Sequence, residues 1–379
     1  MKRPQGVYED KQRGTWYWMA DAPGPDGKKR KVKKRGFATA EEARDDRDKF
    51  RARVRDGHVP VPANDTVAAF ATAWIAALPA EEVEPATVRN YSECVNRLLP
   101  TIGTVKLQEL TALDLDRAYA ALRELGRSAR TVRASHVAVK KMLAEAVRIK
   151  KVSANVAAAA RPPRSKSTAA KRFPTWTYEQ LGRFLETVAD HQHADLWRIA
   201  GWTGMRQGEI VALRWDDVDL DVGTIKVSRA IGRGADGYYE KEPKSAAGRR
   251  TIELDDQLVA VFRRHRQGQL EQRLALGPGW RETDLVFCAL DGSRLDPNGV
   301  SKAWTALVRL HAPSLGVPAI RFHDLRHSHC TQLLDAEVRV DIVTERLGHS
   351  SIAFTLQQYV HRYAGDQRSG LARLRATAT

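Results

Sequence analysis

The apolar positions of this sequence fall into three successive patterns. In the first 57 residues they form two short β-type runs, residues 14–20 and 30–37, separated by the turn-forming stretch 21–27. A helix is expected next, because Thr39 can cap a run of helix-forming residues over 41–55. The first pattern therefore predicts a small β-sheet with one helix.

In the second pattern, from about residue 65 to residue 155, apolar residues recur every three or four positions, as in amphipathic helices. Pro85 suits the first turn of a helix and Ser128 suits an N-cap. The pattern predicts an all-helical bundle. The expected helices are residues 67–78, 85–99, 113–125 and 128–151.

The third pattern, from residue 172 onwards, mixes helical and β-type runs. Helices are expected over residues 178–190 and 196–215, with a break at Gly204 and a new start at Arg206. A mixed, mainly helical domain with a small antiparallel sheet is the expected fold. The expected strands are residues 224–230 and 237–243, paired as a hairpin, and residues 250–254.

Two polar, proline-containing stretches separate these patterns, residues 58–63 (HVPVPA) and residues 160–172 (ARPPRSKSTAAKR). With 379 residues, the chain is long enough for several domains that each bury a core. We therefore predict a multidomain protein, with domains over residues 1–57, 64–160 and 172–379.

The net charge of +16 indicates a polyanionic partner, and nucleic acid is the commonest one. Seven of the eight residues 28–35 are basic and lie in a predicted strand with aromatic residues nearby, which favours a β-ribbon lying against DNA. A solvated strand or a nuclear signal is the plainer explanation of such a run. The residues expected to contact DNA are Lys28, Lys29, Arg30, Lys31, Lys33, Lys34 and Arg35 in the strand, and Arg89, Arg130, Arg133, Lys140 and Lys141 on the polar faces of the bundle.

Several other classes of protein are disfavoured. Three scattered cysteines indicate reduced thiols and a cytoplasmic protein, and we expect neither a membrane span nor a signal peptide. Residues 232–237 match G-x-G-x-x-G, but a strand-like run follows them where a nucleotide-binding site needs a helix. Residues 216–223 lack the glutamate that closes a calcium loop, and no Walker motif is present.

Residues 321–330, RFHDLRHSHC, are rich in histidine and arginine and could form either a metal site or an anion site. On a helix, His323, Arg326 and His327 share one face. Zinc is disfavoured because neither the HExxH glutamate nor a second Cys/His pair is present. An arginine repels a metal ion but forks onto phosphate oxygens, so the pattern favours phosphate and no metal. His329 and Cys330, like His327, are expected to be packing or surface residues.

Five short motifs, one of them within residues 321–330, follow one another in a fixed order: TGMRQGEI, PKS, RFHDLRH, LGHSS and TLQQYVH. Over residues 172–362 they resemble the tyrosine recombinase (phage integrase) family. The helical domain, with PTIGTVKLQELT and AEAVRIKKVSANV, is similar to that family's core-binding domain. The N-terminal sheet resembles, more loosely, the arm-binding domain of phage-type integrases. The family's catalytic positions then fall on Arg206, Lys244, His323, Arg326, His349 and Tyr359.

The resemblance implies that Tyr359 attacks a DNA phosphate and forms a 3′-phosphotyrosine ester. Tyr363, one turn further on, is the alternative nucleophile. The ester stores the energy of the broken bond, so neither ATP nor another cofactor is expected.

The remaining positions surround the phosphate in this interpretation. Arginine guanidinium groups and histidine rings can donate to its non-bridging oxygens. His323 is implied as the acid/base partner of the tyrosine, and Lys244 as the general acid for the leaving 5′-hydroxyl. Glu209, three residues after Arg206, is expected to orient that arginine, although an ordinary helix salt bridge is an equally plain explanation.

The resemblance further implies a site-specific recombinase of a phage or other mobile element. Its partners would be double-stranded DNA at core and arm attachment sites, four copies of the chain, an excisionase and a host DNA-bending protein. The tail after Tyr363 is a candidate for exchange between copies. Four alternatives stay open: a chromosome-resolving Xer-type recombinase, a type IB topoisomerase, a DNA-binding regulator without catalysis, and a metal-dependent nuclease.

Overall fold

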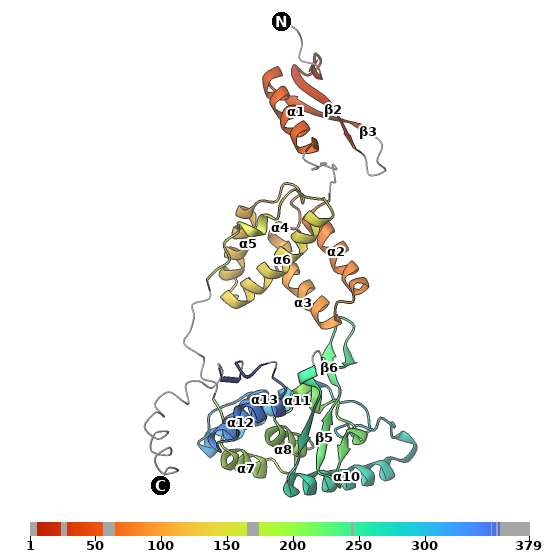
Figure 1. Cartoon of the computed structure of the whole chain (residues 1–379), viewed down its shortest axis with the longest axis vertical. Helices are drawn as coiled ribbons and strands as arrows, with labels where there is room; N and C mark the ends of the chain where they lie inside the picture. The colour runs from red at the N-terminus through yellow and green to blue at the C-terminus, as the bar shows by residue number, and fades with distance from the viewer. Residues whose placement is uncertain are drawn as a thin grey trace. The chain divides into compact units, whose positions relative to one another are not determined.

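The computed structural model of this protein describes residues 6–23, 29–55, 65–164, 174–243, 246–349, 351–353 and 355–356. Two compact units make up the chain, Met1–Ser167 and Thr168–Thr379. Figure 1 shows the helices and strands of each. The domain boundaries predicted at residues 57, 64 and 172 lie outside the described residues, so the division into three domains stays a prediction.

The first part of the N-terminal unit is a three-stranded antiparallel sheet with one helix on it (Figure 1). The predicted helix cap is confirmed, because Thr39 Oγ1 accepts from the Glu42 N–H at 3.2 Å. Trp18 is 1% exposed and packs against Phe50 of the helix, with ring centroids 4.8 Å apart. The first strand was not predicted from the sequence. The elements are β1 (Val7–Asp10), β2 (Thr15–Pro23), β3 (Lys29–Phe37) and α1 (Ala40–Arg55).

The second part of this unit is a helical bundle around its own core, and the predicted all-helical fold is confirmed. Pro85 begins a helix, and Ser128 Oγ accepts from the Thr131 N–H at 3.1 Å, so both predicted helix starts are present. Short helical turns connect the long helices. The elements are α2 (Val67–Ala77), η1 (Leu78–Glu81), α3 (Pro85–Asn96), α4 (Leu99–Ile102), α5 (Ala112–Glu124), α6 (Ala129–Arg148) and η2 (Val156–Ala158).

The C-terminal unit is mainly helical and carries small antiparallel sheets, as predicted. Its core contains Trp197 and Trp304, both 0% exposed and with ring centroids 5.6 Å apart. The Trp304 indole N–H donates to the Ile320 carbonyl at 3.0 Å. The elements are α7 (Tyr178–Thr187), α8 (Ala194–Thr203), α9 (Gln207–Ile210), η3 (Trp215–Asp217), β4 (Val218–Asp219), β5 (Thr224–Val227), β6 (Ala230–Arg233), β7 (Tyr238–Lys241), η4 (Ala246–Gly248), β8 (Arg250–Glu253), α10 (Asp256–Leu276), η5 (Gly277–Gly279), α11 (Pro297–Leu315), α12 (Asp324–Asp335) and α13 (Val340–Leu347).

The predicted hairpin between residues 224–230 and 237–243 is wrong. β5 lies between β4 and β8 in one sheet, and β7 pairs with β6 in another. The run splits at Ser228 and Arg229, because both side chains contact Asp217, at 2.8 Å and 3.5 Å, and the chain leaves the first sheet there.

The second part of the predicted helical run, from Arg206 to residue 215, is shorter than expected. α8 ends at Thr203, and α9 comprises only Gln207–Ile210. Beyond it the backbone pairs with a distant segment, since the Val286 N–H donates to the Leu213 carbonyl at 2.9 Å and the Trp215 N–H donates to the Asp284 carbonyl, also at 2.9 Å. In the described parts of the chain, no helix combines the length and the apolar character that crossing a bilayer requires.

Candidate active site and nucleic-acid interface

A glycine turn presents Arg206 at the start of α9. Gly204 ends α8 with φ +66°, a conformation that favours glycine, and an added Cβ would lie 2.7 Å from side-chain atoms of His329 and Leu347. No other residue fits there without displacing those side chains. The helix break and restart predicted at Gly204 and Arg206 are therefore confirmed.

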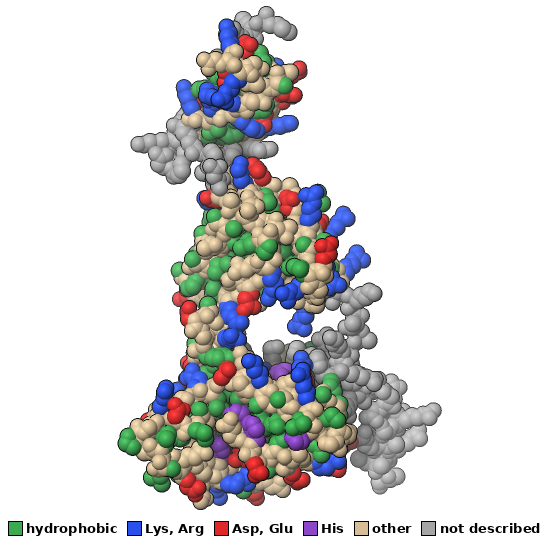
Figure 2. All heavy atoms as spheres, turned by 180° about the vertical axis from the view of Figure 1, so that it is seen from behind, with side chains coloured by type: hydrophobic (Ala, Val, Ile, Leu, Met, Phe, Trp, Pro, Cys, Tyr) green, Lys and Arg blue, Asp and Glu red, His purple; other side chains and the backbone are tan. Residues whose placement is uncertain are grey.

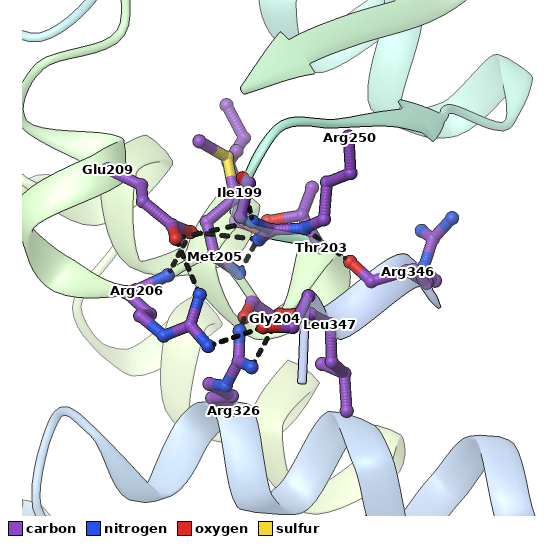
Figure 3. A network of polar contacts seen from close by, with 12 residues as sticks. Ile199, Thr203, Gly204, Met205, Arg206, Glu209, Arg250, Arg326, Arg346 and Leu347 are labelled. Carbon is purple, nitrogen blue, oxygen red and sulfur yellow. Dashed lines mark hydrogen bonds and ion pairs between the residues drawn. The ribbon is translucent and has the colours of Figure 1, made fainter. Parts of the chain in front are cut away.

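Glu209 is a buried carboxylate that two arginines share (Figure 3). Arg206 Nη1 donates to Oε1 at 2.8 Å, and the Arg206 backbone N–H donates to Oε2 at 2.9 Å. From the other side, Arg250 Nη2 donates to Oε2 at 2.8 Å and Nη1 donates to Oε1 at 3.2 Å. Both carboxylate oxygens are satisfied, so the guanidinium groups are held in defined orientations.

The C-terminal end of α13 holds three arginines through three consecutive carbonyl groups (Figure 3). Carbonyls at a helix C-terminus lack partners within the helix and carry the negative end of its dipole, so they suit cations. Gly348 ends this helix with φ +64°. The carbonyl oxygens of Arg346, Leu347 and Gly348 accept from Arg250 Nε at 2.6 Å, Arg326 Nη2 at 2.5 Å and Arg206 Nη2 at 2.7 Å, respectively.

Positive charge exceeds negative charge in this cluster, which we call the arginine cluster (Arg206, Arg250, Arg326 and Glu209). Burial and the neighbouring Arg206 charge lower the pKa of Arg326 to about 9. Burial alone would raise the pKa of Glu209, but the hydrogen bonds and charges of Arg250 and Arg206 outweigh it and lower the pKa to about 2. Three guanidinium groups around one carboxylate form a site for an anion with several oxygens, such as phosphate.

A Glu209→Gln variant is expected to be less stable than the wild type at neutral pH, and its free energy of unfolding should fall less on acidification. A carboxylate whose pKa falls on folding stabilises the fold above its unfolded pKa, and this contribution is lost as the pH falls through the folded pKa. The shift from 4.5 to about 2 corresponds to roughly 3 kcal/mol, lost between about pH 5 and pH 2. Urea unfolding at pH 6 and at pH 3 measures this effect. Between the two pH values, the free energy of unfolding should fall by about 2 kcal/mol more for the wild type than for Glu209→Gln. The exposed-site control Glu345→Gln should behave like the wild type, and equal acid sensitivity of all three proteins would contradict this account.

His349 directly follows the helix end that holds the arginines. Its Nδ1 lies 2.7 Å from the hydroxyl oxygen of the buried Thr355. Burial lowers the pKa of His349 to about 3, with further contributions from Arg326 and Arg206. The ring is therefore neutral in the free protein and carries a single N–H.

His323 lies at the start of α12, three residues before Arg326. Its ring reaches the surface, while the packed residues around it and the charge of Arg326 lower its pKa. The ring of His327 lies beside it with centroids 5.3 Å apart, and burial followed by the effect of His323 lowers the pKa of His327 to about 4. A neutral His323 at pH 7 can accept a proton.

His329 and Cys330 are buried, as expected of packing residues. Arg346 Nε donates to His329 Nε2 at 3.1 Å, so the ring proton is on Nδ1, which lies 2.8 Å from the hydroxyl oxygen of Tyr178. Across the ranges that the structure describes, no group of three or more His, Cys, Asp or Glu residues is arranged to hold a metal ion. The absence of a metal site in the whole protein stays a prediction.

The structure brings together Arg206, Arg326 and His349 from three separate segments, and the charges of the two arginines act on both His349 and His323. Lys244 and Tyr359, and the alternative nucleophile Tyr363, lie outside the described residues. The catalytic roles of all these residues stay predictions.

Arg250 was not predicted as a site residue, because it falls in a strand-like run, residues 250–254. Its side chain is only 2% exposed. In β8 it occupies an inward position on the same face as the buried Ile252, two residues later. An arginine in phase with the buried residues of a strand is a signal that could have identified it, because a buried cation needs a partner.

The open face of the N-terminal sheet combines aromatic and basic side chains. Tyr8 stacks on Tyr17 at 5.3 Å between centroids, and Lys33 Nζ lies 4.0 Å from the Tyr17 ring centroid. Arg35 is paired with Tyr17 in the register of the sheet. Lys34 lies on the opposite face, where its Nζ contacts Asp46 of α1 at 2.8 Å. The basic run is thus divided between two faces, and Lys34 is directed to the helix.

The other predicted DNA contacts differ in their surroundings. Lys31 is exposed on β3, and Lys28 and the side chains of Lys29 and Arg30 lie outside the described residues. Arg89 on α3 pairs with Glu93 at 2.7 Å. Figure 2 shows Lys and Arg side chains projecting from the bundle, and histidine side chains reaching the surface of the C-terminal unit. The four predicted DNA contacts on α6, Arg130, Arg133, Lys140 and Lys141, are all exposed.

Comparisons with known proteins agree on one family. The phage integrase family matches residues 171–365, more than half of the chain, and the arm DNA-binding domain family matches residues 7–50. An integrase of Streptomyces ambofaciens is 29% identical over 365 residues, which cover 93% of this chain and 91% of that protein. A tyrosine recombinase XerC-like protein of Caldanaerobacter subterraneus is 26% identical over 272 residues, 68% of each chain.

A solved structure shares the fold. The integrase of the Tn1549 transposon, in complex with transposon right end DNA, matches with a TM-score of 0.66 at 21% sequence identity. The match covers 82% of this chain and 99% of that one.

Proposed function

This chain belongs to the phage integrase family of tyrosine site-specific recombinases, and we propose on that premise that it integrates and excises a mobile element by cleaving and rejoining DNA through a 3′-phosphotyrosine intermediate. The observation that carries this proposal is the arginine cluster, which the end of α13 holds next to His349. Such a cluster binds a phosphodiester and stabilises the charge that develops when it is attacked.

Arg206 and Arg326 bind the two non-bridging oxygens of the scissile phosphate in this proposal. Each terminal guanidinium nitrogen has two N–H bonds, and each contact with a carbonyl or with Glu209 uses one of them. The second N–H is the one proposed to donate to phosphate. Donors of this kind each stabilise the transition state by roughly 3–4 kcal/mol.

Tyr359 attacks the phosphorus with its phenolic oxygen, and the bond from phosphorus to the 5′-oxygen breaks. His323 accepts the phenol proton, which its lowered pKa allows because the ring is neutral at pH 7. Lys244 gives a proton to the departing 5′-oxygen. A second DNA 5′-hydroxyl reverses these steps and joins the new strands without ATP.

Double-stranded DNA is the proposed partner of each part of the chain. The N-terminal sheet would bind an arm site, while the bundle and the C-terminal unit would bind a core site. Two duplexes have four strands to exchange and each chain has one Tyr359, which supports four copies on the DNA. An excisionase and a host DNA-bending protein complete the proposed assembly. The arm-domain match favours an element integrase over a chromosome-resolving Xer recombinase.

Covalent trapping tests this function. The protein is incubated with nicked DNA that carries its core site, in the presence of EDTA, and then denatured. A protein–DNA adduct that survives denaturation is expected. No adduct on a site that is demonstrably bound would favour a DNA-binding regulator, and cleavage that EDTA abolishes would favour a metal-dependent nuclease. Relaxation of supercoiled DNA lacking the site would favour a topoisomerase.

A Lys33→Ala variant should bind arm DNA more weakly than Lys34→Ala. The two residues are neighbours and each change removes one positive charge, but only Lys33 lies on the open face of the sheet. The logarithm of the DNA-binding constant falls linearly with the logarithm of the salt concentration, and each lost phosphate contact makes this slope shallower by about 0.9. Titrations at several salt concentrations should show this change for Lys33→Ala alone. Equal slopes for both variants would argue against the open face as the arm-DNA surface.

A further inference from the structure

The side chain of Arg346, in the last turn of α13, connects three other elements of the C-terminal unit. Its guanidinium group is half-buried and makes one contact through each nitrogen. Nε donates to His329 Nε2 on α12 at 3.1 Å. Nη1 donates to the carbonyl of Glu253, the last residue of β8, at 3.0 Å, and Nη2 donates to the carbonyl of Trp202, near the end of α8, at 3.4 Å. One side chain thus joins α13 to α12, β8 and α8.

The same three elements carry the arginines of the cluster. Arg250 belongs to β8, Arg326 belongs to α12, and Arg206 follows α8 after the turn at Gly204. The backbone carbonyl of Arg346 itself accepts from Arg250 Nε at 2.6 Å. In Figure 3 the side chain of Arg346 points away from the arginine cluster, while its carbonyl faces the cluster. Arg346 is therefore connected to the support of each arginine without being one of the phosphate donors.

The contact with His329 requires a neutral ring. Because the Arg346 Nε–H donates to Nε2, the single ring proton is on Nδ1, which lies 2.8 Å from the hydroxyl oxygen of Tyr178. Burial lowers the pKa of His329 to about 3, and the charge of Arg346 lowers it further. Tyr178 stacks on Trp202 with ring centroids 4.1 Å apart, which fixes the ring on the far side of His329. The acceptor is thus present and held in place at neutral pH.

The other two acceptors lie at the ends of elements. Trp202 is one of the last four residues of α8, so its carbonyl has no partner within the helix. A charged donor to such a carbonyl forms a stronger hydrogen bond than a neutral one. The guanidinium group can reach three separate acceptors because its N–H bonds point outward in a rigid planar fork. No other residue type has this geometry.

We propose that Arg346 is a positioning residue that sets the spacing of Arg206, Arg250 and Arg326 by fixing the end of α13 against α8, β8 and α12. The proposal rests on the proposed function, because it assigns a role toward the same phosphate site. Without the three contacts the helix end is free to shift, and the carbonyls of residues 346–348 shift the guanidinium groups with it. A displacement of about 1 Å at a reacting centre can slow a reaction about 100-fold.

The first test is the single-turnover cleavage rate at saturating core DNA. Arg346→Met keeps most of the stem and removes all three contacts. It should slow cleavage about 10- to 100-fold, with an affinity for core DNA within about threefold of the wild type. Arg346→Lys keeps the charge but lacks the fork, so it should still cleave at least about fivefold more slowly than the wild type. The matched control Arg339→Met removes the same charge from an exposed side chain that pairs with Asp341 at the start of the same helix, and should cleave within about threefold of the wild type.

The second test separates displaced arginines from a generally weakened fold. A methylphosphonate takes the place of the scissile phosphate, so that a neutral methyl group replaces one non-bridging oxygen and no longer accepts from a guanidinium group. This replacement should slow the wild type and Arg339→Met about 100-fold. In Arg346→Met the contact is already weakened, so the same replacement should slow cleavage by about tenfold or less. A change in the substrate does not alter the stability of the protein, so lost stability alone leaves this ratio unchanged.

An unchanged ratio would mean that Arg346 only supports the fold, and would overturn the proposal. Wild-type cleavage by Arg346→Met would overturn it as well, and full recovery by Arg346→Lys would assign the effect to net charge. Weaker binding with a shallower salt dependence would place Arg346 on a DNA phosphate instead. If Arg346→Met does not fold, the ratio is measured on Arg346→Lys, for which an intermediate value is expected. Failure of the wild type to form a covalent adduct would contradict the proposed function, and that result is distinct from all of these.

Discussion

A Tyr359→Phe variant is expected to form no covalent adduct with core-site DNA while it keeps the affinity of the wild type. The phenolic oxygen is the atom that would join phosphorus, and phenylalanine lacks only this atom. The contacts with phosphate that are proposed for the arginine cluster are unaffected by the change. Trapping on nicked DNA with EDTA present measures the adduct, and binding is measured on the same DNA without denaturation.

Tyr363→Phe is the matched control, since it removes the same phenolic oxygen from the tyrosine four residues further along the sequence. It should form the adduct at close to the wild-type rate. An adduct that survives Tyr359→Phe and disappears in Tyr363→Phe would move the nucleophile to Tyr363. Loss of the adduct in both variants would indicate that the segment as a whole, rather than one oxygen, limits the reaction.

An Arg326→Ala variant is expected to cleave about 100- to 1000-fold more slowly than the wild type. Loss of one preorganised donor to a developing oxyanion typically has this effect. Arg326 is 5% exposed and bridges the Gly204 carbonyl, at 2.8 Å, and the Leu347 carbonyl, at 2.5 Å. The side chain therefore both contributes charge and connects the ends of α8 and α13.

Single-turnover rates at saturating DNA separate this catalytic loss from weaker binding. Arg326→Lys keeps the charge, but a lysine cannot make the same forked contacts, so most of the loss should remain. Arg321→Ala removes the same charge from an exposed side chain that pairs with Asp324, and should cleave within about threefold of the wild type. If Arg326→Lys restored the full rate, the effect would be one of net charge and the geometric argument would fail.

Much of the site could be read from neighbouring residues. Arg206 and Glu209 are three residues apart, and the glycine before them breaks the helix, so their salt bridge follows from local rules. The three fold types and the burial of Trp197 and Trp304 follow from periodicity and residue type in the same way. The strand pairing of residues 224–243 was wrong because alternating runs do not specify which partner a strand takes.

Contacts between distant segments were not accessible to such rules. The Arg250 partner Glu209 lies 41 positions away, and the carbonyl that binds Arg206 is 142 positions away. Likewise, whether Lys33 or Lys34 lies on the open face depends on which side of the sheet α1 covers. These pairings depend on where whole elements pack.

Local periodicity and motif order were enough to identify the types of fold, the family and the residues expected to act on DNA, because each depends on neighbours within a few positions. The tertiary structure alone determined that one helix end holds three arginines, that Arg250 completes the cluster, and that a threonine hydroxyl meets Nδ1 of His349. The physical reason is that a buried cation or ring nitrogen takes its partner from whichever segment packs against it, and sequence spacing carries no record of that choice.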